Sequence, residues 1–177
     1  CFPKDVRALI KTAEAAGFNF SILSEVMKAN QFQRTSFLEK VRAFYGRDLK
    51  GKRLAVWGLA FKANTDDMRE APAIDIINGL TGDGAVCRVY DPKAMEHAAR
   101  IFNGNASVLF GKSQYEVLEA ADGLLLLTEW LSFREPDFER IKSLMKQPVI
   151  FDGRNQYNPK LLAERGFRYV CVGRPSV

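Results

Sequence analysis

The chain opens with residues whose types and order suit covalent catalysis. Cys1 precedes Pro3, which favours the first turn of a helix, and Lys4 and Asp5 follow directly. A helix N-terminus and a neighbouring lysine both favour the thiolate, which is the nucleophilic form of cysteine. Asp5 lies one turn onward, where a carboxylate accepts a proton or orients a water molecule. The segment is therefore a candidate nucleophile site, although a cysteine beside a proline usually has no chemical role.

A second group of polar residues follows the first apolar strand-like segment. Val56-Trp57-Gly58 leads into a loop rich in charge, from Lys62 to Arg69. In dinucleotide-binding folds the backbone N–H groups of this turn bind phosphate. Only the first glycine of G-x-G-x-x-G is present, so the sequence does not favour NAD binding by this segment. We expect Lys62 and Arg69 to bind an anion, because the carboxyl ends of parallel strands form the ligand crevice. For the acidic residues of the loop, the sequence is equally compatible with a functional role and with a structural one, in a solvated loop that caps the next helix.

Four other residues have weaker claims to a chemical role. Asp91 ends the second strand-like segment, but it follows Gly58 by 33 residues rather than the roughly 20 of a ribose-binding acid. It also begins an Asp-Pro pair, which favours a structural turn. Cys87 and Cys171 lie in strand patterns and are interpreted as inert core residues. His97, the single histidine, lies on a polar helical stretch, which argues against a Cys–His hydrolase.

Hydrophobic periodicity predicts the elements that must position these residues. A helix is expected from Pro3 to about Gly17, and a helix of about 25 residues from Ile22 to Tyr45, too long for a small domain to cover alone. Beyond the polar stretch 47–52 the pattern alternates between strand and helix. The predicted strands are Leu54–Trp57, Val86–Tyr90, Val108–Phe110, Leu124–Leu127, Val149–Phe151 and Tyr169–Val172. The predicted helices are Ala71–Leu80, Lys93–Ile101, Ser113–Ala120, Pro136–Met145 and Pro159–Glu164, the last with Asn158 as N-cap.

This alternation predicts an α/β fold with a doubly wound, Rossmann-like parallel sheet of about six strands. We expect two parts: a helical segment over residues 1–50, which carries the cysteine and the long helix, and a nucleotide-binding domain over residues 51–177. The apolar residues of the long helix, which occupy more than one face, predict a homodimer.

Composition narrows the class of protein further. The chain has 177 residues, 47% hydrophobic and 27% charged, as expected for a soluble protein with a sizeable core. Of the net charge of +5, most lies in residues 1–50, where nine basic and five acidic residues are mixed along helical sequence. We interpret this as a solvated helix face rather than a nucleic-acid site. Neither a membrane-spanning run nor a secretory signal is recognised, and three scattered cysteines favour a reducing cytoplasm without disulfides or zinc.

Three motifs together resemble the UDP-glucose/GDP-mannose dehydrogenase family. They are Cys-Phe-Pro-Lys-Asp-Val-Arg-Ala-Leu at 1–9, Gly-Leu-Ala-Phe-Lys-Ala-Asn-Thr-Asp-Asp-Met-Arg-Glu-Ala-Pro at 58–72, and Phe-Asp-Gly-Arg-Asn at 151–155. They follow the family's order and spacing, and the long helix falls where that family has its central dimerisation helix. The resemblance covers essentially the whole chain and implies the second half of such an enzyme, with an N-terminal NAD-binding domain missing. Ala63 departs from the proline common in relatives.

The resemblance implies a role for each motif. Cys1 would capture the C6 aldehyde of the sugar as a thiohemiacetal, which is oxidised to a thioester and hydrolysed with support from Asp5, while two NAD molecules are reduced. Lys4 and Arg69 would contact NAD. The remaining implied residues would contact the nucleotide sugar, and these are Phe2, Phe61, Lys62 and Arg154.

The resemblance also sets expectations for the whole molecule. UDP-glucose is the favoured substrate, with GDP-mannose and UDP-N-acetylmannosamine as alternatives within the family. We expect the chain to be part of a longer enzyme and inactive on its own. A non-enzymatic nucleotide-binding or assembly module of flavodoxin-like topology remains the alternative of another class.

Overall fold

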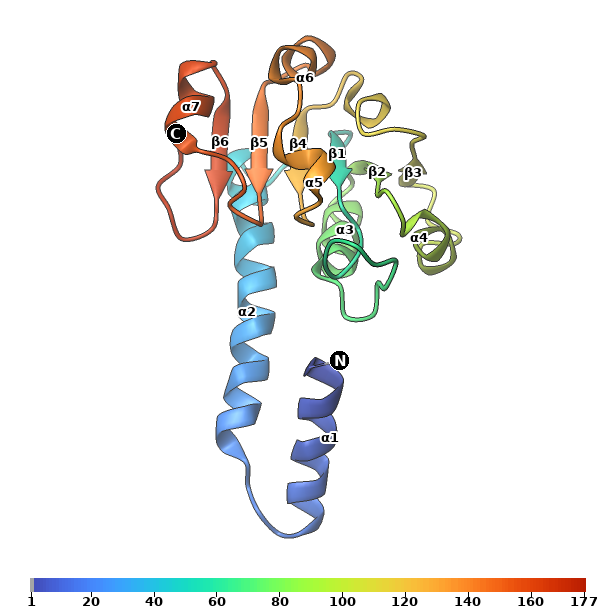
Figure 1. The fold of residues 1–177 in the computed structure, drawn as a ribbon, viewed down its shortest axis with the longest axis vertical. Coiled ribbons are helices and arrows are strands. Elements are labelled where there is room, and N and C mark those ends of the chain that lie inside the picture. The colour runs from blue at the N-terminus through green and yellow to red at the C-terminus, as the bar shows by residue number, and fades with distance from the viewer. Residues whose placement is uncertain (1) are drawn as a thin grey trace. The chain divides into compact units, whose positions relative to one another are not determined.

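The computed structural model describes the backbone of residues 2–177 and the side chains from Pro3 onward (Figure 1). Contacts divide the chain into two compact units, one ending at Ser36 and one spanning Phe37–Val177. The division falls earlier than the domain boundary expected after residue 50. The cause is that Phe37, Leu38 and Val41 are buried in the core of the second unit.

The first unit is helical. Helix α1 spans Phe2–Ala15, and helix α2 begins at Ser21 and runs to Phe44 in the second unit. Gly17 ends α1 in the left-handed conformation with φ +74°, and the N–H of Phe18 donates to the carbonyl of Ala13 at 2.8 Å. This is the usual glycine stop of a helix. The 24 residues of α2 occupy the range expected for the long helix.

The second unit contains a parallel sheet of six strands in the order β3-β2-β1-β4-β5-β6. The predicted α/β fold with a Rossmann-like sheet is therefore confirmed. This order belongs to the dinucleotide-binding type, so the flavodoxin-like topology of the alternative hypothesis is wrong. The strand bounds lie within one residue of those predicted: β1 Arg53–Trp57, β2 Val86–Tyr90, β3 Val108–Phe110, β4 Gly123–Leu126, β5 Val149–Asp152 and β6 Arg168–Cys171.

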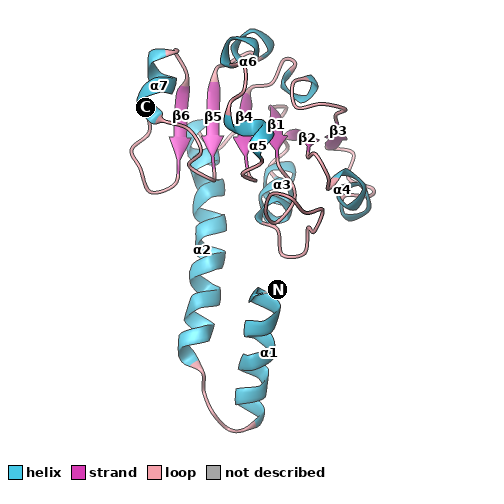
Figure 2. Ribbon diagram, viewed as in Figure 1, coloured by secondary structure: helices cyan, strands magenta, loops and turns pink. Residues whose placement is uncertain are grey.

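Helices cover both faces of the sheet, as Figure 2 shows. The C-terminal turns of α2 and helix α3 lie on one face, where Leu38 contacts Gly79 so closely that a Cβ would overlap it. Helices α5, α6 and α7 lie on the other. The helix bounds in this unit are α3 Pro72–Gly82, α4 Met95–Ile101, α5 Leu131–Arg134, α6 Phe138–Leu144 and α7 Pro159–Glu164.

The predicted helix over Ser113–Ala120 is wrong, because only a 3₁₀ turn forms there, η1 at Glu116–Leu118. The carbonyl of Gln114 accepts the indole N–H of Trp57 at 2.7 Å, which diverts it from a helical hydrogen bond. Ala120 then takes φ +54°, which ends the turn. By contrast, the expected N-cap of α7 is confirmed, since the side chain of Asn158 accepts from the N–H of Lys160 at 3.0 Å.

The central strands β1, β4 and β5 are buried on both faces and form the core of the second unit, whereas β3 at the edge of the sheet is mostly exposed. Residues 54–57 of β1 and all four residues of β4 are fully buried, as parallel strands between two helical layers require. Within residues 2–177, no helix is both long and apolar enough to cross a membrane.

Candidate functional site

The loop after β1 lies at the carboxyl edge of the sheet and carries the central motif. Gly58 begins it with φ +91°, a left-handed conformation that favours glycine. A Cβ at Gly58 would lie 2.5 Å from Cβ of Thr128, so only glycine allows this close approach to the segment after β4. The hydroxyl of Thr128 donates to the carbonyl of Ala60 at 2.7 Å. The loop is thereby held against the end of β4.

Asp91 holds the same loop from the other side. Its carboxylate is 1% exposed and accepts the N–H groups of Leu59 at 2.7 Å and Ala60 at 3.1 Å. It also accepts the N–H groups of Lys93 and Ala94, each at 2.9 Å, which is the turn that its sequence predicted. Because these bonds use both carboxylate oxygens inside the protein, Asp91 is not placed as a ribose ligand.

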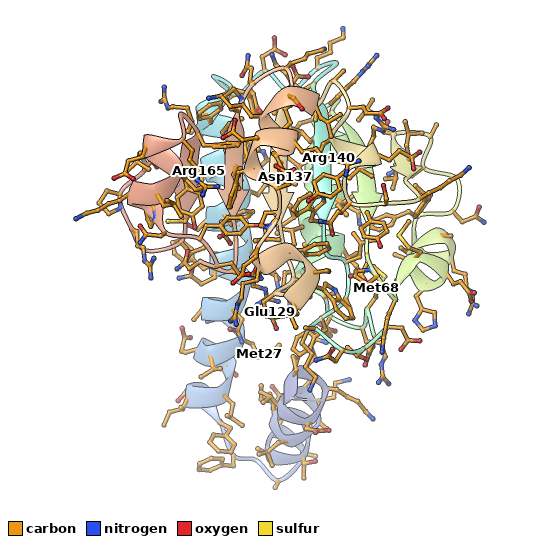
Figure 3. The ribbon with its side chains drawn as sticks, turned by 45° about the horizontal axis from the view of Figure 1, so that its top comes forward. Met27, Met68, Glu129, Asp137, Arg140 and Arg165 are labelled. Carbon is orange, nitrogen blue, oxygen red and sulfur yellow. The ribbon has the colours of Figure 1, made fainter. Side chains whose placement is uncertain are left out.

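The loop after β5 brings the third motif to this edge. The guanidinium of Arg154 donates through Nε to the carbonyl of Leu127 at 2.8 Å and through Nη2 to the carbonyl of Phe61 at 3.1 Å. Nε also lies 3.1 Å from Oε2 of Glu129, which comes from the segment after β4 and is labelled in Figure 3. Arg154 therefore joins the loops that follow β1, β4 and β5.

Asp152 sets the backbone of that third loop. This fully buried carboxylate accepts the N–H groups of Arg154, Gln156 and Tyr157, and the hydroxyl of Tyr169 at 2.8 Å. Burial, followed by the charge of Asp152, raises the pKa of both tyrosine hydroxyls, Tyr157 and Tyr169, above the usual range. These groups stay protonated and act as hydrogen-bond donors.

Two of the predicted substrate-binding residues, Phe61 and Arg154, are in contact where the loops after β1 and β5 meet. Phe61 is half-buried and is tied to Arg154 through its carbonyl. The adjacent Lys62 is exposed, and no hydrogen bond or ion pair joins its amine to another residue of the described part of the chain. Among the side chains that the structure describes, the amine of Lys62 is thus available to a ligand, on a loop whose backbone is fixed by Asp91, Thr128 and Arg154.

Arg69 lies further along the loop and has a different environment. Its side chain is 80% exposed and forms a two-point contact with Asp67, with distances of 3.0 Å from Nε to Oδ1 and 2.7 Å from Nη2 to Oδ2. This guanidinium lowers the pKa of Asp67 to about 2. Near it, ring nitrogen Nδ1 of His97 lies 2.9 Å from the carbonyl oxygen of Asp66.

An open groove of about 490 Å³ separates this part of the loop from α4. Arg69, His97 and Arg100 line it, together with the buried Met68, which is labelled in Figure 3. The groove is lined by acidic side chains, Asp66 and Asp67, as well as by basic ones, so its charge does not select one class of ligand.

The remaining predicted residues belong to the first unit. Cys1 lies outside the described residues, and Phe2 is described only as the first residue of α1. Lys4 and Asp5 are exposed on the first turn of that helix. The structure therefore brings the loops of Phe61, Lys62 and Arg154 together. The segment that follows Cys1 belongs to the other compact unit.

The other two cysteines are free and buried, as expected for core residues. Burial raises the pKa of Cys87 to about 12, and burial together with Asp152 raises that of Cys171. Neither favours a thiolate. Sequence reasoning missed Thr128, Glu129 and Trp130, since nothing in their local pattern indicates which neighbouring loop they contact.

Comparisons with known proteins agree on one family. The family described as "UDP-glucose/GDP-mannose dehydrogenase family, UDP binding domain" matches residues 55–159. UDP-glucose 6-dehydrogenase of Pseudomonas aeruginosa is 42% identical over 99% of this chain and 39% of its own length, and that of Rhizobium meliloti is 41% identical over 99% and 40%. The chain thus spans about two fifths of these relatives, in their C-terminal part.

Solved structures show the same relationship. A UDP-glucose dehydrogenase from Pyrobaculum islandicum superposes with a TM-score of 0.76 at 31% identity, over 87% of this chain and 33% of that protein. A UDP-D-ManNAc dehydrogenase from Pyrococcus horikoshii gives 0.76 at 26% identity, over 98% and 38%. The fold, the edge-of-sheet motifs and the matched range lead to one assignment: the chain belongs to the UDP-glucose/GDP-mannose dehydrogenase family and carries its UDP binding domain.

Proposed function

We propose that this chain is the nucleotide-sugar-binding part of an NAD-dependent dehydrogenase that oxidises UDP-glucose to UDP-glucuronate. The observation that carries the proposal is the hydrogen bond from Arg154 to the carbonyl of Phe61, which joins two family motifs 93 residues apart at one edge of the sheet. The names of the relatives support the choice of UDP-glucose.

The charges at this edge suit a nucleoside diphosphate sugar. Lys62 is exposed and uncommitted among the described residues, so its amine is available to a diphosphate. The guanidinium of Arg154 is held by two carbonyls and by Glu129 through Nε and Nη2, so its Nη1 group is the part best placed to donate to a ligand oxygen. Phe61 adds an aromatic surface beside them. We assign these three residues, with Phe2, to substrate binding.

The chemistry is assigned to the start of the chain. In this proposal Cys1 is the nucleophile that bonds the oxidised sugar carbon, and Asp5 supports hydrolysis of the resulting thioester. The exposed position of Asp5 in the first turn of α1 is compatible with contact to water. Cysteine usage still predicts a cytoplasmic location.

NAD does not fit the phosphate-binding position of this chain. The loop after β1 lacks two glycines of the fingerprint, and the N–H groups of Leu59 and Ala60 already donate to Asp91. We therefore assign NAD mainly to a domain outside this chain, with Lys4 and Arg69 as contributing residues. The chain alone is accordingly expected to produce no NADH from UDP-glucose, because hydride transfer requires the nicotinamide within about 3–3.5 Å of the reacting carbon.

Helices α1 and α2 are assigned to homodimer formation. Large apolar side chains are exposed on the first unit, including Ile22 at 72% and Phe32 at 68%. A second copy of the chain would cover such a surface. Light scattering of the chain over a range of concentrations tests this assignment, and a strict monomer at the highest concentration would contradict it.

Calorimetric titration of the full chain with UDP-glucose, UDP and GDP tests the binding function. We expect UDP and UDP-glucose to bind, and Lys62→Ala to weaken both by about tenfold or more, because a charge-assisted hydrogen bond is lost. Lys112→Ala, an exposed lysine after β3, is the matched control and should bind normally. Absence of heat with either uridine nucleotide would overturn the proposal, whereas preference for GDP would favour the GDP-mannose branch of the family.

A further inference from the structure

The loop after β1 places two consecutive backbone N–H groups where a doubly wound fold binds a phosphate. Leu59 and Ala60 follow Gly58, whose φ is +91°. Successive N–H groups beside a left-handed residue form a concave site for anions. Here both groups donate to the same oxygen, Oδ2 of Asp91, at 2.7 and 3.1 Å. The anion in this site belongs to the protein itself.

Three further donors complete the surroundings of this carboxylate. The indole N–H of Trp130 donates to Oδ2 at 3.0 Å, and the N–H groups of Lys93 and Ala94 donate to Oδ1. Asp91 is 1% exposed, so water does not replace any of these donors. A carboxylate with five N–H donors from three separate segments is as fully coordinated as a bound phosphate oxygen pair would be.

We propose that Asp91 is a built-in anion that takes the place of a nucleotide phosphate in the loop after β1 and fixes that loop in one conformation. The N–H groups that would receive a dinucleotide are occupied. Phosphates must then be bound by side chains on the fixed loop, above all Lys62. This last step rests on the proposed function and makes Asp91 a positioning residue for the nucleotide site.

Chemical rescue tests the built-in anion without any nucleotide. Asp91→Ala leaves a carboxylate-sized space lined by donors, so we expect its unfolding midpoint to fall by roughly 5–10 °C. Sodium formate should recover at least half of that loss, compared with sodium chloride at equal ionic strength. Formate should not stabilise the unmodified chain or Asp91→Asn, in which the amide fills the space.

Hydrogen exchange of the Leu59 and Ala60 amides gives the local readout. Both should lose protection in Asp91→Ala and regain it in formate. Asp122→Ala, a buried aspartate before β4 whose carboxylate accepts the N–H of Arg53 at 2.8 Å, is the control and should leave these two amides unchanged. Retained protection at both amides in Asp91→Ala, or no effect of formate beyond that of chloride, would overturn the proposal. If Asp91→Ala fails to fold, Asp91→Asn replaces one carboxylate oxygen by an NH₂ group, so protection should fall either at Leu59 and Ala60 or at Lys93 and Ala94. Retained protection at all four amides of that variant would overturn the proposal.

UDP titration of the same variants tests the positioning step. We expect the affinity of folded Asp91→Ala for UDP to fall by about tenfold and to recover in formate. A purely structural role would lower the unfolding midpoint and leave the affinity of the folded protein unchanged, and that result would overturn the positioning step. If the unmodified chain binds no UDP while formate rescue is observed, the proposed function and the positioning step fail together and the built-in anion stands.

Discussion

Two buried aspartates at the carboxyl edge of the sheet hold neighbouring loops in different ways. Asp152, the last residue of β5, accepts its backbone donors from its own loop, and these are Arg154, Gln156 and Tyr157. Asp91, just after β2, accepts the N–H groups of the β1 loop and the indole of Trp130, which lie 31 to 39 residues away. The β5 loop is thus set mostly by local sequence, whereas the β1 loop is set by segments that meet only in the assembled sheet.

The β5 loop presents Arg154 through hydrogen bonds of its own, whereas the β1 loop presents Lys62 only while other segments hold its backbone in place. Arg154 lies in the locally determined loop and reaches across to the carbonyl of Phe61. Lys62 follows Phe61 in the loop that depends on its neighbours. We therefore expect the loss of stability caused by a substitution to depend more strongly on contacts across the sheet in the β1 loop than in the β5 loop.

The largest effect is expected for Gly58→Ala. The new Cβ would lie 2.5–2.7 Å from three atoms of Thr128, and alanine is strained at φ +91°. The two penalties together should lower the free energy of unfolding by about 3 kcal/mol or more. Urea denaturation measures this change.

Gly153→Ala in the β5 loop is the matched control. Its Cβ would lie 3.2 Å from the carbonyl oxygen of Leu126, and small shifts relieve that contact. We expect a loss of about 1 kcal/mol. Equal losses at the two glycines would contradict the difference drawn between the loops.

Asp152→Asn should have the next largest effect. The amide places an NH₂ group among N–H donors and leaves some of them buried without an acceptor, which costs about 2–3 kcal/mol. Tyr169→Phe removes a single donor to the same carboxylate at 2.8 Å and should cost about 1 kcal/mol. The two variants together, measured by the same denaturation, should lose less than the sum, because they share a partner. Additive losses would mean that the hydroxyl of Tyr169 does not contact Asp152 in solution.

A smaller loss is expected at the N-cap of α7. The side chain of Asn158 accepts from the N–H of Lys160, and Asn158→Ala should destabilise the chain by about 1 kcal/mol. Asn158→Ser retains an acceptor and should stay within about 0.5 kcal/mol of the unmodified chain. An equal loss for serine and alanine would show that the cap contributes nothing.

The N-cap and the strands were predictable because their signals are local. Asn158 precedes Pro159, and continuous apolar runs mark the buried parallel strands. The turn at Asp91 was also predictable, since its Oδ1 accepts from Lys93 and Ala94 directly after it. The sequence did not indicate which groups donate to Oδ2 of the same carboxylate, because the order of the strands determines which segments lie beside it.

The site shows the same limit. Lys62 and Arg154 were named from their motifs, but the link between their loops depends on β1, β4 and β5 lying side by side. The short turn at Glu116–Leu118 was mistaken for a helix for a similar reason. Its competing hydrogen bond comes from Trp57, on a distant strand. The local sequence pattern does not indicate hydrogen bonds between residues that are far apart in the chain.

The smallest effect concerns an aspartate that is not buried. The side chain and backbone N–H of Arg69 hold the pKa of Asp67 at about 2, below its ordinary value of 3.8. A carboxyl whose pKa is lowered by folding stabilises the folded state above its unfolded pKa, and this contribution is lost as the pH falls from about 4 to about 2. Because the side chains of Arg69 and Asp67 are 80% and 34% exposed, solvent screens the pair and the contribution should stay below about 1 kcal/mol.

A double-mutant cycle over Asp67→Asn and Arg69→Gln measures this contribution at pH 6 and again near pH 2. We expect a coupling energy below about 1 kcal/mol at the higher pH, a smaller value in 1 M salt, and a smaller value again near pH 2, where about half of the Asp67 carboxyls are protonated. Such a result would place Asp67 apart from Asp91 and Asp152, whose N–H donors salt does not screen. A coupling above about 2 kcal/mol that resists salt would instead mean that the pair is shielded from solvent more than its exposure indicates.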